Sequence, residues 1–207
     1  MEAKGLKRAC LYSCCGCWQV EKMGVGKELL SFFKRESPGK KQCEFIIKIL
    51  KNLHPYKGYC LIRSLKGLKS PFNPNVVRDY WLGDEKLETY NLSHNFATLA
   101  RFREINSDEH LPDWIVNKML DCAISFGKII KVGSEKSRVL NYRLLYKKGR
   151  VVFGKETREV DAGFVNDFKK GDLVSIHWGI AREKISREQA KTLRDVTSKA
   201  IKTLQMA

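Results

Sequence analysis

The chain lacks the long apolar runs that would place it in a membrane. Its longest apolar stretches, such as Phe45 to Ile47 and Cys122 to Ser125, are far shorter than the ~20 residues a helix needs to cross a bilayer. Near the N-terminus, Lys7 and Arg8 are followed by cysteines rather than by the aliphatic stretch of a secretory signal. We therefore predict a cytoplasmic protein with no membrane partner.

The sequence also lacks the short motifs of several common enzyme classes. It contains no Ser-His-Asp order, no phosphate-binding P-loop and no dinucleotide-binding glycine pattern. Seven cysteines, an odd number, without a secretion signal argue against a disulfide framework and favour reduced thiols, some of them available to a metal. We predict that the protein is not an enzyme.

Acidic side chains are scarce, with 23 Asp and Glu against 39 Lys and Arg, so that the net charge is +16. Residues 1–118 carry 20 basic and 13 acidic side chains, and residues 119–207 carry 19 and 10. Because a nucleic-acid-binding protein more often gathers its basic residues on one face, this diffuse excess favours acidic partners or polyanions in general. A generally basic proteome would explain the same number.

Helical periodicity dominates the first part of the chain. Apolar spacing predicts helices over 26–36, 43–53 and 87–102, whereas 1–20 is cysteine-rich and irregular and 56–75 is typical of a loop. With 43% hydrophobic residues, the 207 residues suffice for one large domain or two small ones. We predict a helical, cysteine-rich N-terminal domain over 1–118.

The pattern changes to short alternating segments near residue 120. The segments that predict strands are 122–132, 139–146, 150–153, 157–160 and 173–178. A C-terminal helix begins after Ser186, which has capping-box spacing to Gln189. We predict an α+β protein whose residues 119–207 form a small OB-like β-barrel followed by that helix.

Two motifs in this second region bring a soft ligand to a strand end. One is Asp121-Cys122-Ala123-Ile124-Ser125-Phe126-Gly127-Lys128-Ile129, and the other is Gly171-Asp172-Leu173-Val174-Ser175-Ile176-His177-Trp178-Gly179-Ile180-Ala181. Two soft ligands on neighbouring strand ends could hold a metal fragment. The alternative interpretation is a buried thiol and a core histidine with no metal between them.

The two motifs and the helix after them resemble the HypC/HupF hydrogenase-assembly chaperones, small barrel proteins that help to build the iron centre of nickel–iron hydrogenases. The resemblance implies that Cys122 and His177 hold a transient iron with cyanide and carbon monoxide ligands. It implies a non-enzymatic accessory protein for metallocentre assembly, whose partner is a hydrogenase large-subunit precursor or an iron-carrying maturation protein. Here Cys122 is internal, whereas the family cysteine follows the initiator Met.

The same resemblance assigns structural roles around the two ligands. Gly127 and Gly179 are expected to admit tight turns or the close approach of a partner backbone. Gly171 and Asp172 are expected to shape the turn before the last strand.

The whole chain also resembles an uncharacterised family associated with hydrogenase gene clusters. The shared steps are Cys15-Gly16, Tyr80-Trp81-Leu82-Gly83-Asp84, His94-Asn95-Phe96 and the strand ending in His177-Trp178. Among these, His94 can approach the barrel, although a histidine in such a position is more often a helix-face residue.

The cysteines near the N-terminus form a second candidate site. The four thiols are Cys10, Cys14, Cys15 and Cys17. Their spacing is compatible with zinc or an iron–sulfur cluster, completed by Cys43, Cys60 or His54. The spacing of radical-SAM enzymes is matched too, but the helices that follow lack the alternating strands of that fold. Reduced cysteines on a packed helix are the other interpretation.

A nucleic-acid-binding module is the remaining alternative for the barrel. It predicts surface aromatics interleaved with cations, namely Tyr142, Tyr146, Lys147, Lys148 and Arg150.

Overall fold

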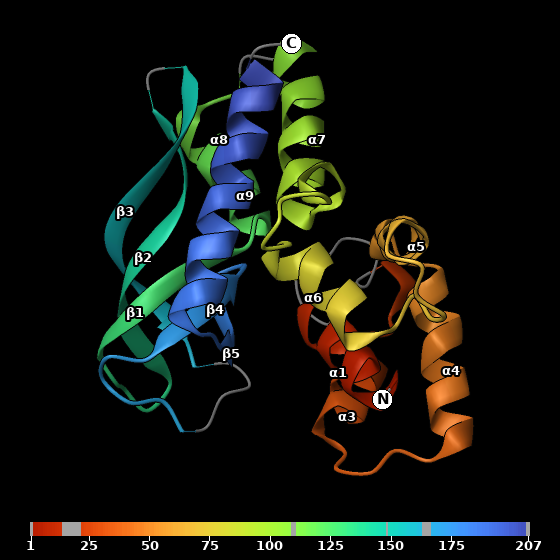
Figure 1. Cartoon of the computed structure of the whole chain (residues 1–207). Helices are drawn as coiled ribbons and strands as arrows, with labels where there is room; N and C mark the ends of the chain where they lie inside the picture. Colours follow the sequence, from red (N-terminus) through yellow and green to blue (C-terminus); the bar gives the residue numbers. More distant parts are fainter. Residues whose placement is uncertain (1, 14–21, 109–110, 148, 163–166, 206–207) are drawn as a thin grey trace. The chain divides into compact units, whose positions relative to one another are not determined.

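A computed structural model describes residues 2–13, 22–108, 111–147, 149–162 and 167–205 (Figure 1). The chain divides into two compact units, Met1–Trp81 and Leu82–Ala207. The division therefore lies well before residues 118 and 119, where the sequence pattern had placed it.

The first unit is helical. Its described helices are α1 (Glu2–Ser13), α3 (Gly26–Lys34), α4 (Lys40–Lys51), α5 (Pro55–Leu65) and α6 (Pro74–Leu82). Aromatic rings fill the space between α1, α5 and α6. The Trp81 ring stacks on Tyr12 with centroids 5.0 Å apart, and its Nε1 donates to the Tyr59 hydroxyl at 2.7 Å. This polar contact lets two large rings with polar edges be buried together.

Two segments of this unit differ from the sequence-based prediction. Residues expected to be irregular form α1, and part of the expected loop over 56–75 forms α5. Pro55 opens α5 at a position where the missing N–H costs nothing. Position 58 lies within α5 and is a glycine because a Cβ there would lie 2.3 Å from the Tyr80 ring. This glycine permits close packing and does not mark a turn.

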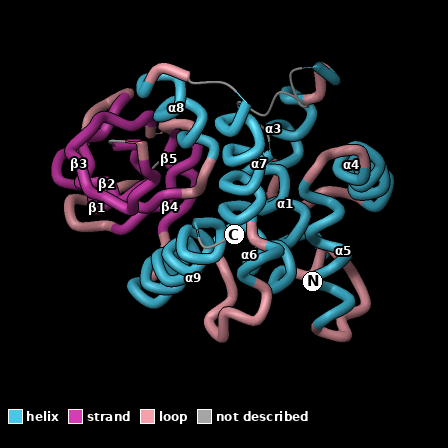
Figure 2. The backbone as a smooth tube through the Cα atoms, turned by 90° about the horizontal axis from the view of Figure 1, so that it is seen from above, coloured by secondary structure: helices cyan, strands magenta, loops and turns pink. Residues whose placement is uncertain are grey.

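The second unit combines helices with a five-stranded barrel. Its elements are η1 (Tyr90–Leu92), α7 (His94–Asp108), α8 (Asp113–Met119), η2 (Leu120–Cys122), β1 (Ser125–Lys131), β2 (Lys136–Lys147), β3 (Arg150–Asp161), β4 (Leu173–His177), β5 (Ile180–Lys184) and α9 (Arg187–Gln205). The strands close in the order β1-β2-β3-β5-β4, and Figure 2 shows them as a ring. The predicted α+β class, with a helical N-terminal region and a C-terminal helix, is confirmed.

The strands differ in detail from those predicted. The segments 150–153 and 157–160 belong to one strand, β3, which pairs with β2 along its whole length from Lys147↔Arg150 to Lys136↔Asp161. Residues 180–184 form β5, which the sequence pattern did not predict. The apolar core of the barrel consists of Ile129, Val139, Val160, Val174, Ile176 and Ala181.

Helices α7, α8 and α9 pack against the outer side of β2 through a second apolar core. Its buried members are Leu99, Phe102, Val116, Leu120, Ala123, Leu144 and Ala200. Burying these side chains with the barrel removes apolar surface from water, which explains why residues 82–118 belong to this unit. At the start of α9, Ser186 and Gln189 exchange the two hydrogen bonds of a capping box, as predicted.

None of the described helices combines the length and the apolar character that crossing a membrane requires.

The turn before β4 generates a pH-dependent prediction. Asp172 accepts a hydrogen bond from the Lys169 backbone N–H at 2.9 Å and pairs with Lys184 at 3.0 Å, which lowers the pKa of its carboxyl below 3.8. A lowered pKa means that the carboxylate stabilises the fold above pH 3.8 and that this contribution is lost as the pH falls through the folded-state pKa. We expect Asp172→Asn to lower the unfolding midpoint at pH 7.

The difference in midpoint between the natural protein and Asp172→Asn should shrink as the pH falls below 3.8. Denaturant titrations at a series of pH values measure it. Asp161→Asn, at the exposed end of β3, is the matched control and should change little. An Asp172→Asn defect that is equally large at every pH would contradict the assignment.

Candidate metal centre

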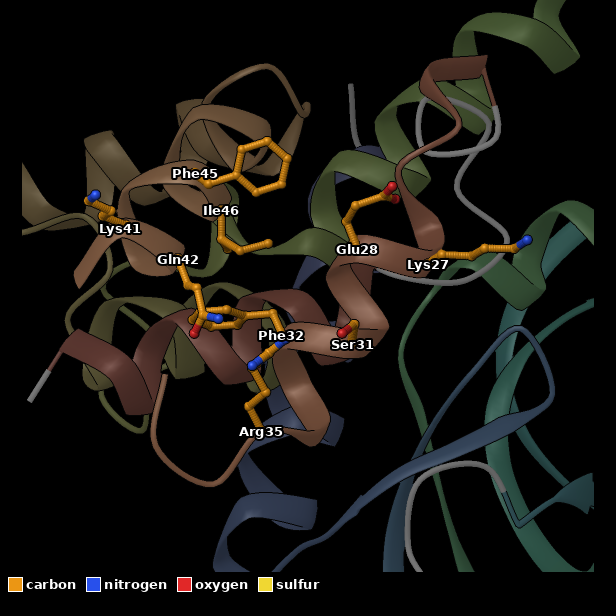
Figure 3. Close-up of a pocket in the computed structure, with 9 residues that line it drawn as sticks. All are labelled: Lys27, Glu28, Ser31, Phe32, Arg35, Lys41, Gln42, Phe45 and Ile46. Atoms are coloured by element: carbon orange, nitrogen blue, oxygen red, sulfur yellow. The ribbon is translucent and has the colours of Figure 1, made fainter. Parts of the chain in front are cut away.

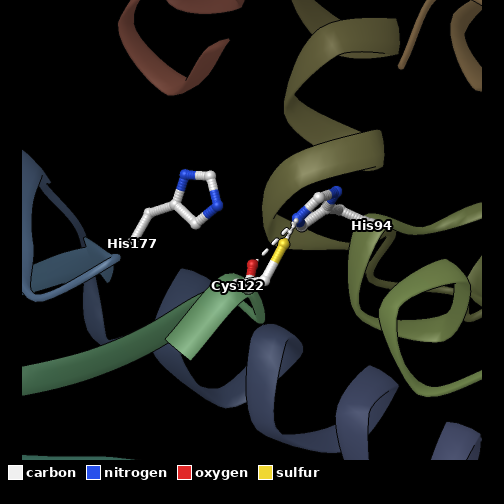
Figure 4. Close-up of side chains that lie close together, drawn as sticks. All are labelled: His94, Cys122 and His177. Carbon is white, nitrogen blue, oxygen red and sulfur yellow. Dashed lines mark hydrogen bonds between the residues drawn. The ribbon is translucent and has the colours of Figure 1, made fainter. Parts of the chain in front are cut away.

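Three metal-ligating side chains meet where three elements of the second unit begin or end. His94 is the first residue of α7, Cys122 the last of η2 and His177 the last of β4. Their ligand atoms all lie within 4.8 Å of one another (Figure 4). Within the described parts of the chain, this is the one cluster of three or more such residues that is close enough to hold a single ion. The imidazole of His177 is buried, whereas the other two side chains are half-buried.

The closest pair in the cluster is His94 and Cys122. The His94 Nε2 atom lies 3.7 Å from the Cys122 Sγ atom and 2.9 Å from the Cys122 carbonyl oxygen. Because a carbonyl oxygen only accepts, the second contact requires the proton on Nε2. The two imidazole rings are 5.3 Å apart between centroids and nearly perpendicular. One turn along α7, the Thr98 hydroxyl donates to Sγ at 3.9 Å.

The distances fit a metal ion, provided that His94 Nε2 gives up the proton that it donates to the Cys122 carbonyl oxygen. At the bond lengths of zinc to sulfur and nitrogen, the ligand atoms of a tetrahedral site lie about 3.5 Å apart. The 3.7 Å contact is already close to that value, and the 4.8 Å limit leaves a side-chain movement of about 1 Å. One thiolate and two imidazoles suit zinc, iron and copper. The cluster can therefore hold a metal ion, and three protein ligands leave a coordination position for another molecule.

Asn95 fixes the start of α7 against the segment that follows Cys122. Its Oδ1 accepts from the Ile124 backbone N–H at 2.7 Å, and its Nδ2 donates to the Ile124 carbonyl at 2.8 Å. The same Nδ2 donates to Thr197 Oγ1 on α9 at 2.8 Å. Since Asn95 is only 1% exposed, these bonds are made away from water. They place His94, one residue earlier, beside Cys122.

Asp121 fixes the end of β4 from the other side of Cys122. Its backbone carbonyl accepts from the Trp178 N–H at 2.9 Å. Its carboxylate accepts from Arg158 at 2.9 Å and pairs with Arg143 at 3.2 Å. His177 is held in addition by the buried Arg182, which donates to its carbonyl oxygen at 3.0 Å. Cys122 and His177 thus share backbone supports that do not involve their own side chains.

A strained turn follows His177. Trp178 and Gly179, with φ of 55° and 75°, form the two-residue connection between β4 and β5, where His177 faces Ile180. Two successive positive φ values are typical of a type I′ hairpin turn. Glycine adopts this backbone freely, whereas tryptophan does so at a cost. The expectation of a tight turn at Gly179 agrees with this geometry.

Gly127 does not make a turn or expose its backbone to a partner. It lies within β1, and a Cβ there would lie 3.1 Å from Ile176 and 3.2 Å from Val139 inside the barrel. The expectation of a turn at Gly127 was therefore wrong, because the barrel interior needs the small residue for packing. Gly171, with φ of 99°, does occupy the turn before β4.

The N-terminal cysteine site lies largely outside the described residues, which exclude Cys14, Cys15 and Cys17. Cys10 is completely buried within α1, and this burial raises the pKa of its thiol well above the ordinary value. A buried neutral thiol is a poor metal ligand, because the thiolate is the form that binds.

The tyrosines proposed as base-stacking platforms make contacts within the barrel unit. Tyr142 stacks on Phe126 with centroids 5.1 Å apart, and the Tyr146 ring lies 5.9 Å from that of Phe102. Both tyrosines are half-buried, while Lys147 and Arg150 are exposed and Lys148 lies outside the described residues.

Sequence reasoning found Cys122 and His177 but did not assign His94 to the site. It also gave no role to Asn95 or to the backbone of Asp121. The tripeptide His94-Asn95-Phe96 was the available signal, since it is one of the steps that the chain shares with a second family.

Asn95→Ala tests whether the clamp positions the ligands. The substitution leaves the Ile124 N–H and C=O without their partner, which should cost about 3 kcal/mol of unfolding free energy. It should also weaken Co²⁺ binding about tenfold, because the helix that carries His94 loses its support. Denaturant unfolding and an optical Co²⁺ titration measure the two effects. Asn91→Ala, in η1 and exposed, should alter neither, and unchanged Co²⁺ affinity in Asn95→Ala would remove the positioning role.

Comparison with known families gives one match. A model described as a family of unknown function (DUF6390) matches residues 107–207, slightly less than half of the chain. This segment is similar to that family and includes Cys122 and His177 but not His94. No curated protein and no solved structure matches the chain.

Proposed function

We propose that the second unit holds an iron cargo through Cys122, His177 and His94 and serves as a non-enzymatic accessory protein in nickel–iron hydrogenase assembly. The observation that carries the proposal is the convergence of these three side chains from α7, η2 and β4 to within 4.8 Å. His94 and His177 are 83 positions apart in the sequence, so the fold and not local chain geometry brings them together.

The fold around the cluster supports the chaperone interpretation. A five-stranded closed barrel with the order β1-β2-β3-β5-β4 is compatible with an OB-like, HypC-like domain. The two motifs that resemble HypC/HupF proteins supply two of the three ligands. Both motifs fall on adjoining elements, because Ser125 at the start of β1 pairs with Ile176 near the end of β4.

His94 adds a third ligand that the HypC/HupF resemblance does not imply. In the HypC/HupF proteins the cysteine follows the initiator Met, so that a free amine lies near the thiol when the Met is removed. Cys122 is internal and has no such amine. In this chain His94 Nε2 lies 3.7 Å from the thiol and would become a donor to the cargo once it loses the proton that it gives to the Cys122 carbonyl. We infer that the imidazole takes the place of the missing amine as a donor to the cargo.

The chain's own residues would hold the cargo and keep one side of it accessible. The thiolate of Cys122 supplies a strong donor, and the buried His177 keeps its imidazole in one orientation. The remaining coordination positions would belong to cyanide and carbon monoxide. The partner that receives or delivers the iron would be a hydrogenase large-subunit precursor or an iron-carrying maturation protein.

Metal binding by the full chain is the direct test. Protein purified without oxygen should bind one Fe²⁺, and Cys122→Ser, His177→Ala and His94→Ala should each weaken the affinity about 100-fold. Competition with a chromophoric chelator measures the affinities. Cys60→Ser, on α5 in the first unit, is the matched thiol control and should bind like the natural protein.

The cargo itself is tested by producing the chain together with the hydrogenase maturation proteins. Iron-bound cyanide and carbon monoxide should appear in its infrared spectrum and disappear in Cys122→Ser. Co-purification of the large-subunit precursor should be lost in the same variant. A zinc ion that cannot be exchanged, with no iron under any condition, would replace the proposal with a structural zinc site.

A further inference from the structure

The boundary at Trp81 changes how the charge of the chain is distributed. Residues 1–81 carry 16 basic and only 6 acidic side chains, whereas residues 82–207 carry 23 and 17. The helical unit therefore holds most of the net positive charge in the smaller part of the chain. An excess of this size in one compact unit favours a negatively charged partner.

The same unit contains a groove between α3 and α4 with a volume of about 490 Å³. Its lining residues, drawn in Figure 3, are Lys27, Glu28, Ser31, Phe32, Arg35, Lys41, Gln42, Phe45 and Ile46. Phe32 and Ile46, 3% and 2% exposed, form the closed floor of the groove, so Phe45 is the apolar lining side chain that a partner can contact. Phe45 itself is 54% exposed, at the edge of the groove.

The groove combines this apolar surface with cations. Lys27, Arg35 and Lys41 are exposed, and Glu28 is the one carboxylate among the lining residues. A hollow between two helices with an exposed aromatic ring at its edge can receive one apolar side chain of an amphipathic partner helix. Cations beside the groove select acidic flanks on that helix, because like charges would repel.

We propose that the groove between α3 and α4 binds an acidic amphipathic helical segment of a partner protein, with an apolar side chain of that segment packed on Phe45. This recognition surface is separate from the metal centre and does not rest on the function proposed for it. A nucleic acid fits less well, because its phosphates would use the cations but leave the exposed Phe45 ring without an apolar partner. The net charge alone would attract any polyanion, whereas the exposed phenylalanine requires an apolar contact.

A designed peptide provides the test. The probe is a fluorescent helical peptide with leucines at i, i+3, i+4 and i+7 and glutamates elsewhere, titrated with the full chain in 150 mM salt. We expect a Kd of about 10 μM, in the range of a single small groove. Phe45→Ala should weaken binding about tenfold, as is usual for an aromatic anchor, and Lys41→Glu combined with Arg35→Glu should weaken it at least as much.

Matched controls separate this groove from general attraction. Leu65→Ala removes another exposed apolar side chain, on α5, and Lys57→Glu combined with Lys69→Glu reverses two charges outside the groove. Each control variant should bind the peptide with a Kd within about twofold of that of the natural protein. This is well below a tenfold change, which corresponds to about 1.4 kcal/mol. Thermal unfolding checks that every variant is folded.

Three outcomes would overturn the proposal. The first is equal binding of a scrambled peptide with the same composition. The second is a peptide affinity that Phe45→Ala does not change. The third is a single-stranded oligonucleotide or an anionic phospholipid vesicle that binds more tightly than the peptide and displaces it, which would assign the surface to a polyanion or to a membrane.

Discussion

The candidate metal centre depends on one buried amide. Asn95 satisfies both backbone groups of Ile124 and also reaches Thr197, so that α7, the segment before β1 and α9 are joined at one point. At a buried position, losing a hydrogen-bond partner costs more free energy than forming the bond contributes, because water cannot reach the group that is left without a partner. The distance between His94 and Cys122 is therefore set by the packing of the whole unit. It is not the chance approach of two mobile side chains.

Each of the three ligands has its support in the residue next to it. Asn95 follows His94, Asp121 precedes Cys122, and Trp178 follows His177 and binds the Asp121 carbonyl. Supports placed this way orient the ligands without occupying the space a metal would need. The strained backbone of Trp178 indicates that this turn too is held by its surroundings, since strain persists only where surrounding contacts determine the conformation.

Much of the fold could be predicted because local signals agreed with it. The capping box of Ser186 and Gln189 begins α9, and alternation over 139–146 lies within β2. The failures have physical causes. Gly58 is typical of a loop in sequence, yet it lies in α5. A glycine is needed at this helical position because Tyr80 occupies the space of its Cβ. β5 was missed because it is five residues long and follows a two-residue turn that contains tryptophan.

The site was predicted in part for a similar reason. Cys122 and His177 stand in motifs whose order and spacing are visible along the chain. His94 contacts Cys122 across 28 positions, and no periodicity reports a contact of that kind. The difference between the expected boundary near residue 118 and the division after Trp81 has the same origin. Helical spacing over 87–102 predicts a helix but does not reveal that Leu99 and Phe102 pack with Leu144 of the barrel.

The division after Trp81 also shows that the two units differ in net charge. In the second unit, the arginines nearest the centre are neutralised within the fold, since Arg143 and Arg158 share Asp121 and Arg143 also pairs with Glu156. The first unit has 6 acidic side chains to set against 16 basic ones, and such an excess destabilises a compact state through self-repulsion. An acidic ligand would relieve that repulsion and would stabilise the folded unit by mass action. The excess of the first unit thus favours an acidic partner, whereas in the second unit Arg143 and Arg158 use their charge to hold Asp121 beside the site.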